Sequence, residues 1–134
     1  MLNHSFGRYG LTLDGVWTPN TDYSNAKTKA LLLKETQEMI TEYKETKGLL
    51  LFMLGNENNY GLFWDGAETE DIPVKDRKST ARAVSMYKLF NEAVVSMKSI
   101  DSAHPIAICN GDLLFLDIIA KECKDVDILG TNVY

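Results

Sequence analysis

The sequence predicts an α/β fold built on a parallel sheet, and three observations support this. Amphipathic stretches long enough for helices alternate with short apolar runs typical of buried strands. The connections between the apolar runs are long enough to return the chain for parallel pairing. Unusual polar and aromatic residues gather directly after apolar runs, where parallel α/β proteins place their functional loops.

The first helix and the first strand follow a long stretch without periodicity. Residues 1–20 carry glycine, asparagine and aromatic residues without a helical or strand pattern, which predicts a long loop and a chain that opens mid-fold. Ser24–Lys47 has apolar residues near one face and is predicted to be a helix, with Gly48 as its left-handed stop. The run Leu49–Leu54 then predicts a strand buried on both faces.

The second half of the chain repeats this alternation. Gly55–Lys78 is polar, aromatic and acidic and is predicted to be a second long loop. Apolar residues at steps of three and four predict a helix over Ser79–Ile100, and Pro105–Cys109 is predicted to be a strand. A helix over Leu113–Lys121 and a strand over Val126–Gly130 complete the prediction.

The composition excludes several classes of protein. The 134 residues are 45% hydrophobic and 25% charged, as in folded globular domains rather than disordered or collagen-like chains. With 19 acidic and 14 basic residues and no basic stripe, we expect no nucleic-acid partner. The longest apolar run, Leu49–Leu54, is far shorter than the roughly 20 residues of a membrane span, and residues 1–4 lack a signal-peptide layout. We therefore expect no membrane partner, and the sequence predicts no compartment.

The candidate catalytic and sugar-binding residues follow the first predicted strand. A carboxylate such as Glu57 at the end of a buried strand is partly desolvated, which raises its pKa toward the range of a general acid. Asn56 can hydrogen-bond a sugar hydroxyl, and the rings of Tyr60 and Trp64 offer flat faces to a pyranose. Together these residues indicate carbohydrate chemistry. A helix cap or a loop ion pair at Glu57, and local packing of the aromatic rings, are the structural alternatives.

An apolar strand that ends in Asn56-Glu57 resembles the fourth barrel strand of the clan A retaining glycoside hydrolases. Its local form is closest to family two, the β-galactosidase, β-glucuronidase and β-mannosidase group. The resemblance implies a (β/α)8 TIM barrel that hydrolyses O-glycosidic bonds. It also implies that Glu57 is the general acid/base and that Asn56 contacts the hydroxyl on carbon two of the sugar.

Three further segments extend the resemblance over nearly the whole chain. Val126–Tyr134 is similar to the sixth strand of the clan, where an Asn-x-Tyr ending, here Asn132 and Tyr134, places a tyrosine beside the nucleophile. Pro105–Asp112 would be the fifth strand, and His4 would lie just past the third, near the sugar. A surface position for His4 and a frayed chain end at Tyr134 are the alternatives. The implied substrate-binding residues around Glu57 are Asn56, His4, Trp64, Asn132 and Tyr134.

The resemblance implies one partial barrel domain, residues 1–134, from the loop after strand three through strand six. A full barrel has about 250 residues, so strands one to three would lie outside the chain. The retaining mechanism needs two carboxylates about 5–5.5 Å apart, and the clan's nucleophile follows strand seven. We therefore expect the 134-residue chain alone to be inactive, and its sheet edges to promote self-association that buries Leu49–Leu54 and Ile106–Ile108. A secreted or periplasmic parent enzyme is also implied by the resemblance alone.

The remaining interpretations concern cofactors, metal ions, Cys109 and alternative functions. No cofactor and no metal site are expected, since the acidic residues between Asp65 and Asp71 match no calcium loop and are predicted to be solvated. Cys109 is predicted to be a small buried apolar residue. The main alternative function is a non-catalytic α/β module that binds carbohydrate or protein through its aromatic loops. A doubly wound ligand-binding domain is disfavoured because no G-x-G-x-x-G motif follows a predicted strand.

Overall fold

The computed structural model describes residues 1–4, 11–13, 16–18, 21–62 and 78–132. Its main sheet contains four parallel strands in the spatial order β1-β4-β5-β6. These strands are β1 (Leu2–His4), β4 (Phe52–Leu54), β5 (Ile106–Asn110) and β6 (Ile128–Thr131). Three α-helices pack beside the sheet, namely α1 (Ala26–Tyr43), α2 (Lys78–Ile100) and α3 (Leu116–Glu122).

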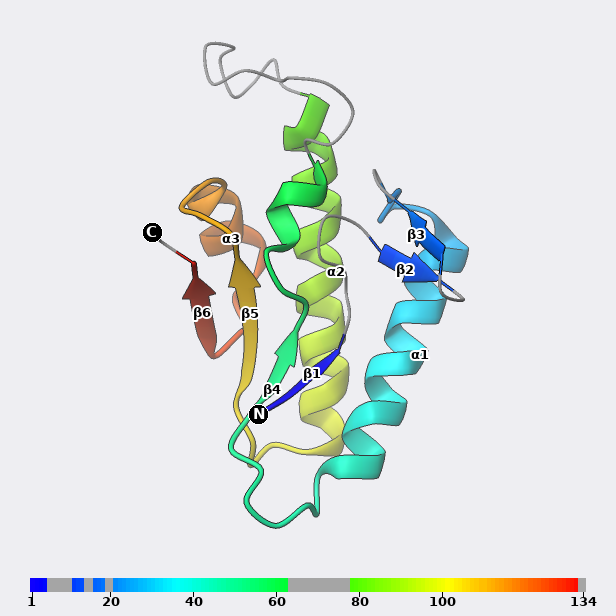
Figure 1. The fold of residues 1–134 in the computed structure, drawn as a ribbon, viewed down its shortest axis with the longest axis vertical. Helices are drawn as coiled ribbons and strands as arrows, with labels where there is room; N and C mark the ends of the chain where they lie inside the picture. Colours follow the sequence, from blue (N-terminus) through cyan, green and yellow to red (C-terminus); the bar gives the residue numbers. More distant parts are fainter. Residues whose placement is uncertain (5–10, 14–15, 19–20, 63–77, 133–134) are drawn as a thin grey trace.

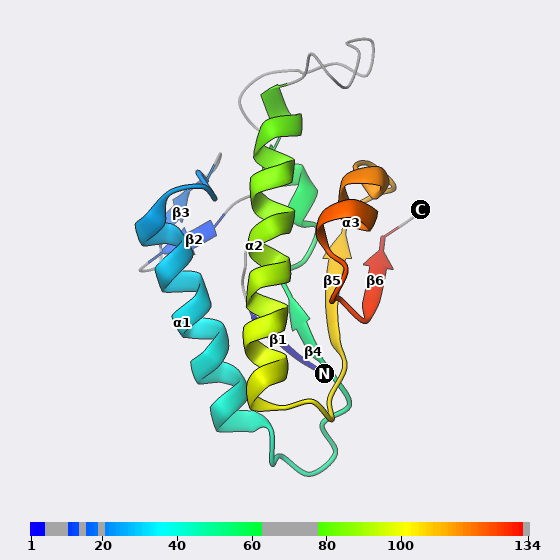
Figure 2. The same cartoon turned by 180° about the vertical axis from the view of Figure 1, so that it is seen from behind.

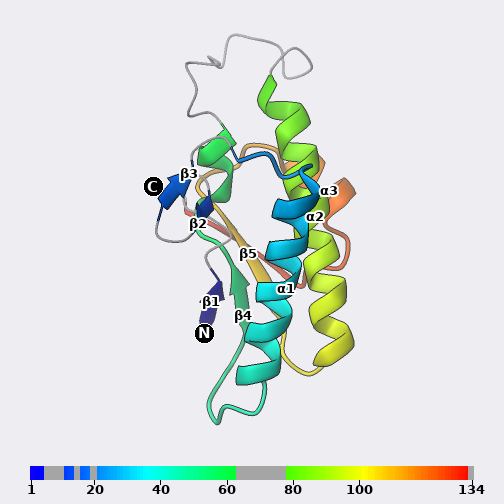
Figure 3. The same cartoon turned by 90° about the vertical axis from the view of Figure 1, so that its right-hand side faces the viewer.

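The strands follow one another across the sheet in chain order, and the helices form a second layer on one face. Figure 1 shows the sheet in front of the helices, Figure 2 shows the same helices from behind, and Figure 3 shows the two layers from the side. A doubly wound sheet would instead reverse its strand order at a switch point and carry helices on both faces. The predicted α/β class with a parallel sheet is confirmed, and the described part of the sheet is singly wound.

Alternate residues of the central strands supply the core. Phe52 and Leu54 of β4 and Ile106 and Ile108 of β5 are fully buried and belong to the apolar cluster that α2 completes. Successive strand residues point to opposite faces, so Met53, Ala107 and Cys109 face away from the helices. The expectation that self-association buries Leu49–Leu54 and Ile106–Ile108 is therefore wrong for these core side chains, which the chain's own helices already cover.

The helices begin and end where local hydrogen bonds dictate. The Asn25 side chain accepts the backbone N–H groups of Lys27 and Thr28, so α1 starts at Ala26 rather than at Ser24. The helix ends at Tyr43, and Gly48 is left-handed (φ 86°) but lies in the turn beyond it. Helix α2 matches its prediction to within one residue.

The predicted strands and the last helix are present with shifted ends. Strand β4 is shorter than predicted because Leu49–Leu51 belong to the connection from α1, where Leu50 is 75% exposed. Helix α3 begins at Leu116 rather than Leu113, because a turn that includes left-handed Phe115 precedes it. Strand β6 begins two residues later than predicted and ends one residue later, and its Ile128 and Leu129 are 40% and 38% exposed at the edge of the sheet.

The prediction of a structureless loop over residues 1–20 is wrong. Strand β1 pairs in parallel with β4, and β2 (Leu11–Leu13) pairs with β3 (Val16–Thr18) as an antiparallel hairpin. Strand β1 is also a parallel neighbour of β4 that the sequence did not predict. Strands of three residues are too short to show a period, and β1 exists through its pairing with β4.

Between β4 and α2 the structure describes one further element, the 3-10 helix η1 (Asn58–Leu62), where the sequence predicted only loop. In the described part of the chain, no helix is both long and apolar enough to span a membrane.

Candidate active site

Glu57 lies three residues beyond β4, at the carboxyl edge of the sheet. The chain turns sharply here, with left-handed backbone at Gly55 (φ 74°) and at Glu57 (φ 51°). A side chain at Gly55 would overlap the amide group of Asn58, so glycine is required both by its backbone and by its surroundings. The turn directs the chain into η1, where the Tyr60 N–H donates to the Glu57 carbonyl at 3.1 Å.

The Glu57 side chain is held by a residue from the far end of the sequence. Glu57 is only 6% exposed, and the Asn132 amide donates from Nδ2 to its Oε1 at 3.0 Å. Asn132 directly follows β6, and its backbone N–H donates to the Asn110 carbonyl at 3.0 Å, which extends the pairing of β5 with β6. The parallel sheet therefore brings together two predicted site residues that are 75 positions apart.

Cys109 lies between the two predicted asparagines on the face away from the helices. Its Sγ is 3.7 Å from the Asn56 Oδ1 and 3.9 Å from the Asn132 Oδ1, so the thiol is placed to donate a weak hydrogen bond to either amide. Cys109 is buried as predicted, but it faces the polar cluster rather than the apolar core. We call Asn56, Glu57, Cys109 and Asn132 the strand-end cluster.

The loop that carries Glu57 is anchored to the loop after β5 by side chains. Asn58 donates from Nδ2 to the carbonyl groups of Leu54 and Cys109 at 3.2 and 3.1 Å. Asn59 donates from Nδ2 to Asp112 Oδ1 at 2.7 Å, and its Oδ1 accepts the Gly111 N–H at 2.7 Å. Both asparagines are buried, so these bonds form away from water and fix one loop against the other.

Tyr60 completes the anchor. Its hydroxyl donates to the Gly111 carbonyl at 2.7 Å, and its ring lies against the Gly111 Cα, where a Cβ would clash with the ring. Tyr60 is half-buried in this contact. The contact with Gly111 engages the hydroxyl and part of the ring, and the interpretation of Tyr60 as a platform for a pyranose stays a prediction.

The loop after β5 is in turn held by α2. The Tyr87 hydroxyl donates to Asn110 Oδ1 at 2.7 Å, and Asn110 donates from Nδ2 to the Leu114 carbonyl at 3.2 Å. Burial raises the pKa of Tyr87 well above its usual range, so the hydroxyl remains a donor at every physiological pH. A chain of hydrogen bonds thus connects the loop of the strand-end cluster to α2, from Asn59 to Gly111 and from the adjacent Asn110 to Tyr87.

Three predicted site residues remain, and the structure describes the backbone of one of them, His4. His4 is the last residue of β1 and pairs with Leu54 in the register of the sheet, which puts its backbone at the same edge as Glu57. Trp64 and Tyr134 lie outside the described residues, as do the acidic residues between Asp65 and Asp71. Among the residues that are described, no group of three histidine, cysteine or acidic side chains is arranged to hold a metal ion.

Sequence reasoning missed Asn58 and Asn59, and it predicted the burial of Cys109 but not its polar neighbours. The asparagines stood in a polar stretch that resembles any solvated loop, and nothing local marks them as buried. The alternation of side chains along β5 could have placed Cys109 on the same face as the strand-end residues, given the correct register with β4 and β6.

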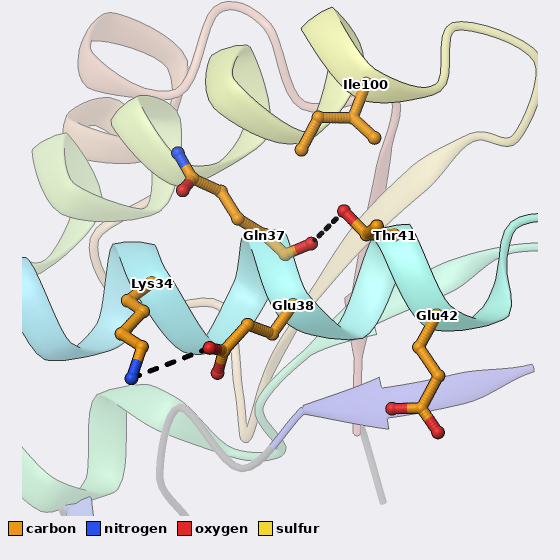
Figure 4. A pocket seen from close by; sticks show the side chains of 6 residues that line it. All are labelled: Lys34, Gln37, Glu38, Thr41, Glu42 and Ile100. Carbon is orange, nitrogen blue, oxygen red and sulfur yellow. Dashed lines mark hydrogen bonds and ion pairs between the residues drawn. The ribbon is translucent and has the colours of Figure 1, made fainter.

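A hollow of about 470 Å³ lies elsewhere, on the helix layer. Figure 4 shows its lining by polar side chains of α1 and by Ile100 at the end of α2. Lys34 pairs with Glu38 at 3.5 Å, and the Thr41 hydroxyl donates to the Gln37 carbonyl at 2.7 Å. These contacts lie within α1 itself, and none of the lining residues belongs to the strand-end cluster.

The chain was compared with known proteins. Comparison with models of protein families gives no match. Comparison with curated protein sequences gives no significant match either.

Proposed function

We propose that the strand-end cluster is the acid/base half of a retaining glycosidase site that cleaves O-glycosidic bonds in a carbohydrate substrate. One observation carries the proposal: Asn132 donates to the buried Glu57 carboxyl group at 3.0 Å. The motif resemblance named these two residues separately, from segments that are far apart in the sequence. Their meeting at one edge of the sheet supports the proposal, because the active site of a (β/α)8 barrel is built from the loops that follow its strands.

Glu57 would act twice in the reaction. In the first step the protonated carboxyl group donates its proton to the glycosidic oxygen as the leaving group departs. In the second step the resulting carboxylate takes a proton from the water that releases the sugar. The Asn132 amide can donate to either protonation state, so it would hold the orientation of the group through both steps.

Asn56 would contact the sugar beside the reacting bond. It is half-buried, next to Glu57 in the sequence, and its Oδ1 lies 3.7 Å from the Cys109 thiol. A thiol donor at the amide oxygen leaves the Nδ2 group of Asn56 to donate to a hydroxyl of the substrate. This supports the contact with the hydroxyl on carbon two that the resemblance implies.

The second carboxylate would come from another strand of a closed barrel. Asp112 lies in the neighbouring loop, but its Oδ1 accepts bonds from Asn59 and from the Leu114 N–H, which suits a structural role. In the proposed barrel, β1, β4, β5 and β6 would be strands three to six, and the nucleophile would follow strand seven. The 134-residue chain alone would then bind the acid/base side of the sugar without turning it over.

A matched pair of variants tests the proposal in the full product of the gene that encodes this chain. Glu57→Gln should lower turnover of an aryl β-glycoside by about 100-fold or more, since general acid–base catalysis contributes on that order. Glu122→Gln, a control glutamate near the end of α3 with a largely covered side chain, should leave turnover within about twofold. Equal turnover in the two variants would rule out the assignment of Glu57.

The alternative binding module gives a different result in the same experiment. The protein would be a non-catalytic carbohydrate-binding module if it binds sugars but turns over no aryl glycoside. Its affinity for the sugar would then be the same in the wild type and in the Glu57→Gln variant. Turnover by the 134-residue chain itself, abolished by Glu57→Gln, would contradict the requirement for a nucleophile from another strand.

A further inference from the structure

We infer that Asn59 is a positioning residue that sets the orientation of the Glu57 carboxyl group. The inference rests on the proposed function only in treating that carboxyl group as the reacting one. Asn59 is fully buried, and both ends of its side-chain amide form hydrogen bonds to the loop after β5. Its Oδ1 accepts the Gly111 N–H at 2.7 Å, and its Nδ2 donates to Asp112 Oδ1 at 2.7 Å. No other described side chain links these two loops through two hydrogen bonds of this kind.

The left-handed backbone of Glu57 needs such an anchor. A non-glycine residue at φ 51° is strained by about 1 kcal/mol or more and persists only where the surroundings enforce it. Asn59 is two residues beyond Glu57 and lies in the first turn of η1, where the Tyr60 N–H donates to the Glu57 carbonyl. Moving Asn59 away from Gly111 would release this turn, and the Glu57 side chain would lose its alignment with Asn132.

The chain contains a matched control for this bridge. Asn91 of α2 donates from Nδ2 to Asp125 Oδ2 at 2.9 Å, and its Oδ1 accepts the Asp125 N–H at 2.9 Å. The chemistry repeats that of Asn59, with one amide joining a carboxylate and a backbone N–H of a distant segment. Both of these hydrogen bonds go to Asp125, which is outside the strand-end cluster, so Asn91 reports what a purely structural bridge contributes.

The readout is the side-chain amide signal of Asn132 in the ¹⁵N-labelled 134-residue chain. Glu57→Ala supplies the position of that signal without the hydrogen bond. In Asn59→Ala the Asn132 signal should move most of the way to this position, while Asn91→Ala should leave it unchanged. The backbone amide signal of Gly111 shows independently that the bond from Asn59 has been removed.

A swapped pair provides the rescue. Asn59→Asp places two carboxylates against each other and should displace the Asn132 signal at neutral pH. Adding Asp112→Asn restores one donor and one acceptor between the two positions and should return the signal toward wild type. Asn59→Asp and its rescue also decide the question if Asn59→Ala fails to fold.

An unmoved Asn132 signal in the Asn59 variants, with the Gly111 signal displaced, would overturn the inference. In the full gene product, Asn59→Ala should lower kcat about 10-fold or more with KM little changed, because misplaced catalytic groups slow the chemical step. A displaced Asn132 signal without any glycosidase activity in the parent would leave the positioning role intact and reject the proposed function. The two claims therefore fail separately.

Discussion

Among single residues, Gly111 is one whose small size the site needs directly. Its carbonyl accepts the Tyr60 hydroxyl, its N–H donates to Asn59, and the Tyr60 ring occupies the space where a Cβ would lie. Because Tyr60 is held at its hydroxyl, the ring cannot simply swing away. The three contacts make Gly111 the meeting point of the two loops.

Gly111→Ala should therefore lower the free energy of unfolding by about 1–3 kcal/mol, the usual cost of overpacking. It should also move the backbone signals of the loop after β4. Gly130→Ala is the matched control, because the nearest atom to a Cβ there is the Ile108 carbonyl oxygen at 3.5 Å, an ordinary contact. Urea unfolding of both variants measures the difference, and equal stabilities would contradict the role assigned to Gly111.

At the scale of residues, the sequence identified side chains that the structure brings together, but not the residues that hold them in place. The Asn56-Glu57 and Asn132 motifs both follow predicted strands. The carboxyl ends of parallel strands lie at the same edge of a sheet, and there the Asn132 amide donates to Glu57. The bridge from Asn59 to Asp112 joins positions 53 residues apart, and polar residues in a loop carry no local sign of such a partner.

At the scale of elements, the connection from α2 to β5 is fixed by one carboxylate. Asp101 accepts the backbone N–H groups of Ala103 and His104 and pairs with His104 Nδ1 at 2.6 Å. Burial alone would raise the pKa of Asp101, but the His104 side chain and the two backbone donors outweigh it and hold the pKa below 3.8. The folded state thus favours the ionised form of this turn.

The lowered pKa of Asp101 predicts that the stability of the protein depends on pH. A carboxylate whose pKa is lowered on folding stabilises the protein above its unfolded pKa, and that stabilisation is lost as the pH falls through the folded value. Asp101→Asn should lower the free energy of unfolding by about 1–2 kcal/mol at pH 7. The deficit should shrink below about pH 4 as the wild-type carboxylate is protonated.

Urea unfolding at pH 7 and pH 3 measures this effect. Glu45→Gln, at an exposed position in the turn after α1, is the control and should change stability little at either pH. A deficit of the same size at both pH values would show that the charge of Asp101 does not hold the turn.

Elements in which the apolar pattern repeats many times were predictable from the sequence. Short strands that depend on pairing with a distant segment were not. Helix α2 was found nearly to the residue because its apolar positions repeat over six turns of helix, on the order of 20 residues. The hairpin of β2 and β3 was missed although Asp14-Gly15 separates its strands, a dipeptide that strongly favours two-residue hairpin turns. Strand β1 has no signal of its own because its three residues depend on β4 for their pairing.

Over the whole molecule, the described sheet has two edge strands, β1 and β6, each with a single neighbour. The apolar side chains left accessible at the β6 edge are Ile128 and Leu129 rather than the buried residues of β4 and β5. An exposed strand edge with apolar side chains offers pairing to a second copy. We therefore expect the 134-residue chain to self-associate through β6.

Ile128→Lys should shift the chain toward monomer in sedimentation velocity at concentrations where the wild type forms dimers or larger species. Val95→Lys is the control, because Val95 of α2 is also an exposed apolar residue but lies on the helix layer. A wild-type chain that stays monomeric at high concentration would contradict the argument from the open edge.

The sequence indicated the parallel sheet because helices and buried strands alternate along the chain. The singly wound order came only with the structure, since periodicity does not say which side of β4 the next strand takes. Four adjacent parallel strands with helices on one face suit a barrel, whose other face would be turned inward. Closure of that barrel is part of the proposal for the full gene product.

The central claim is that Glu57 is the general acid/base, and azide rescue of Glu57→Ala in the full gene product tests it most directly. With an aryl glycoside whose leaving group needs no protonation, the variant should still form the glycosyl-enzyme but release it slowly, because no base activates water. Azide needs no base, so it should raise turnover and yield the β-glycosyl azide. Wild-type turnover in Glu57→Ala, or slow turnover that azide neither accelerates nor diverts to the azide product, would contradict the account.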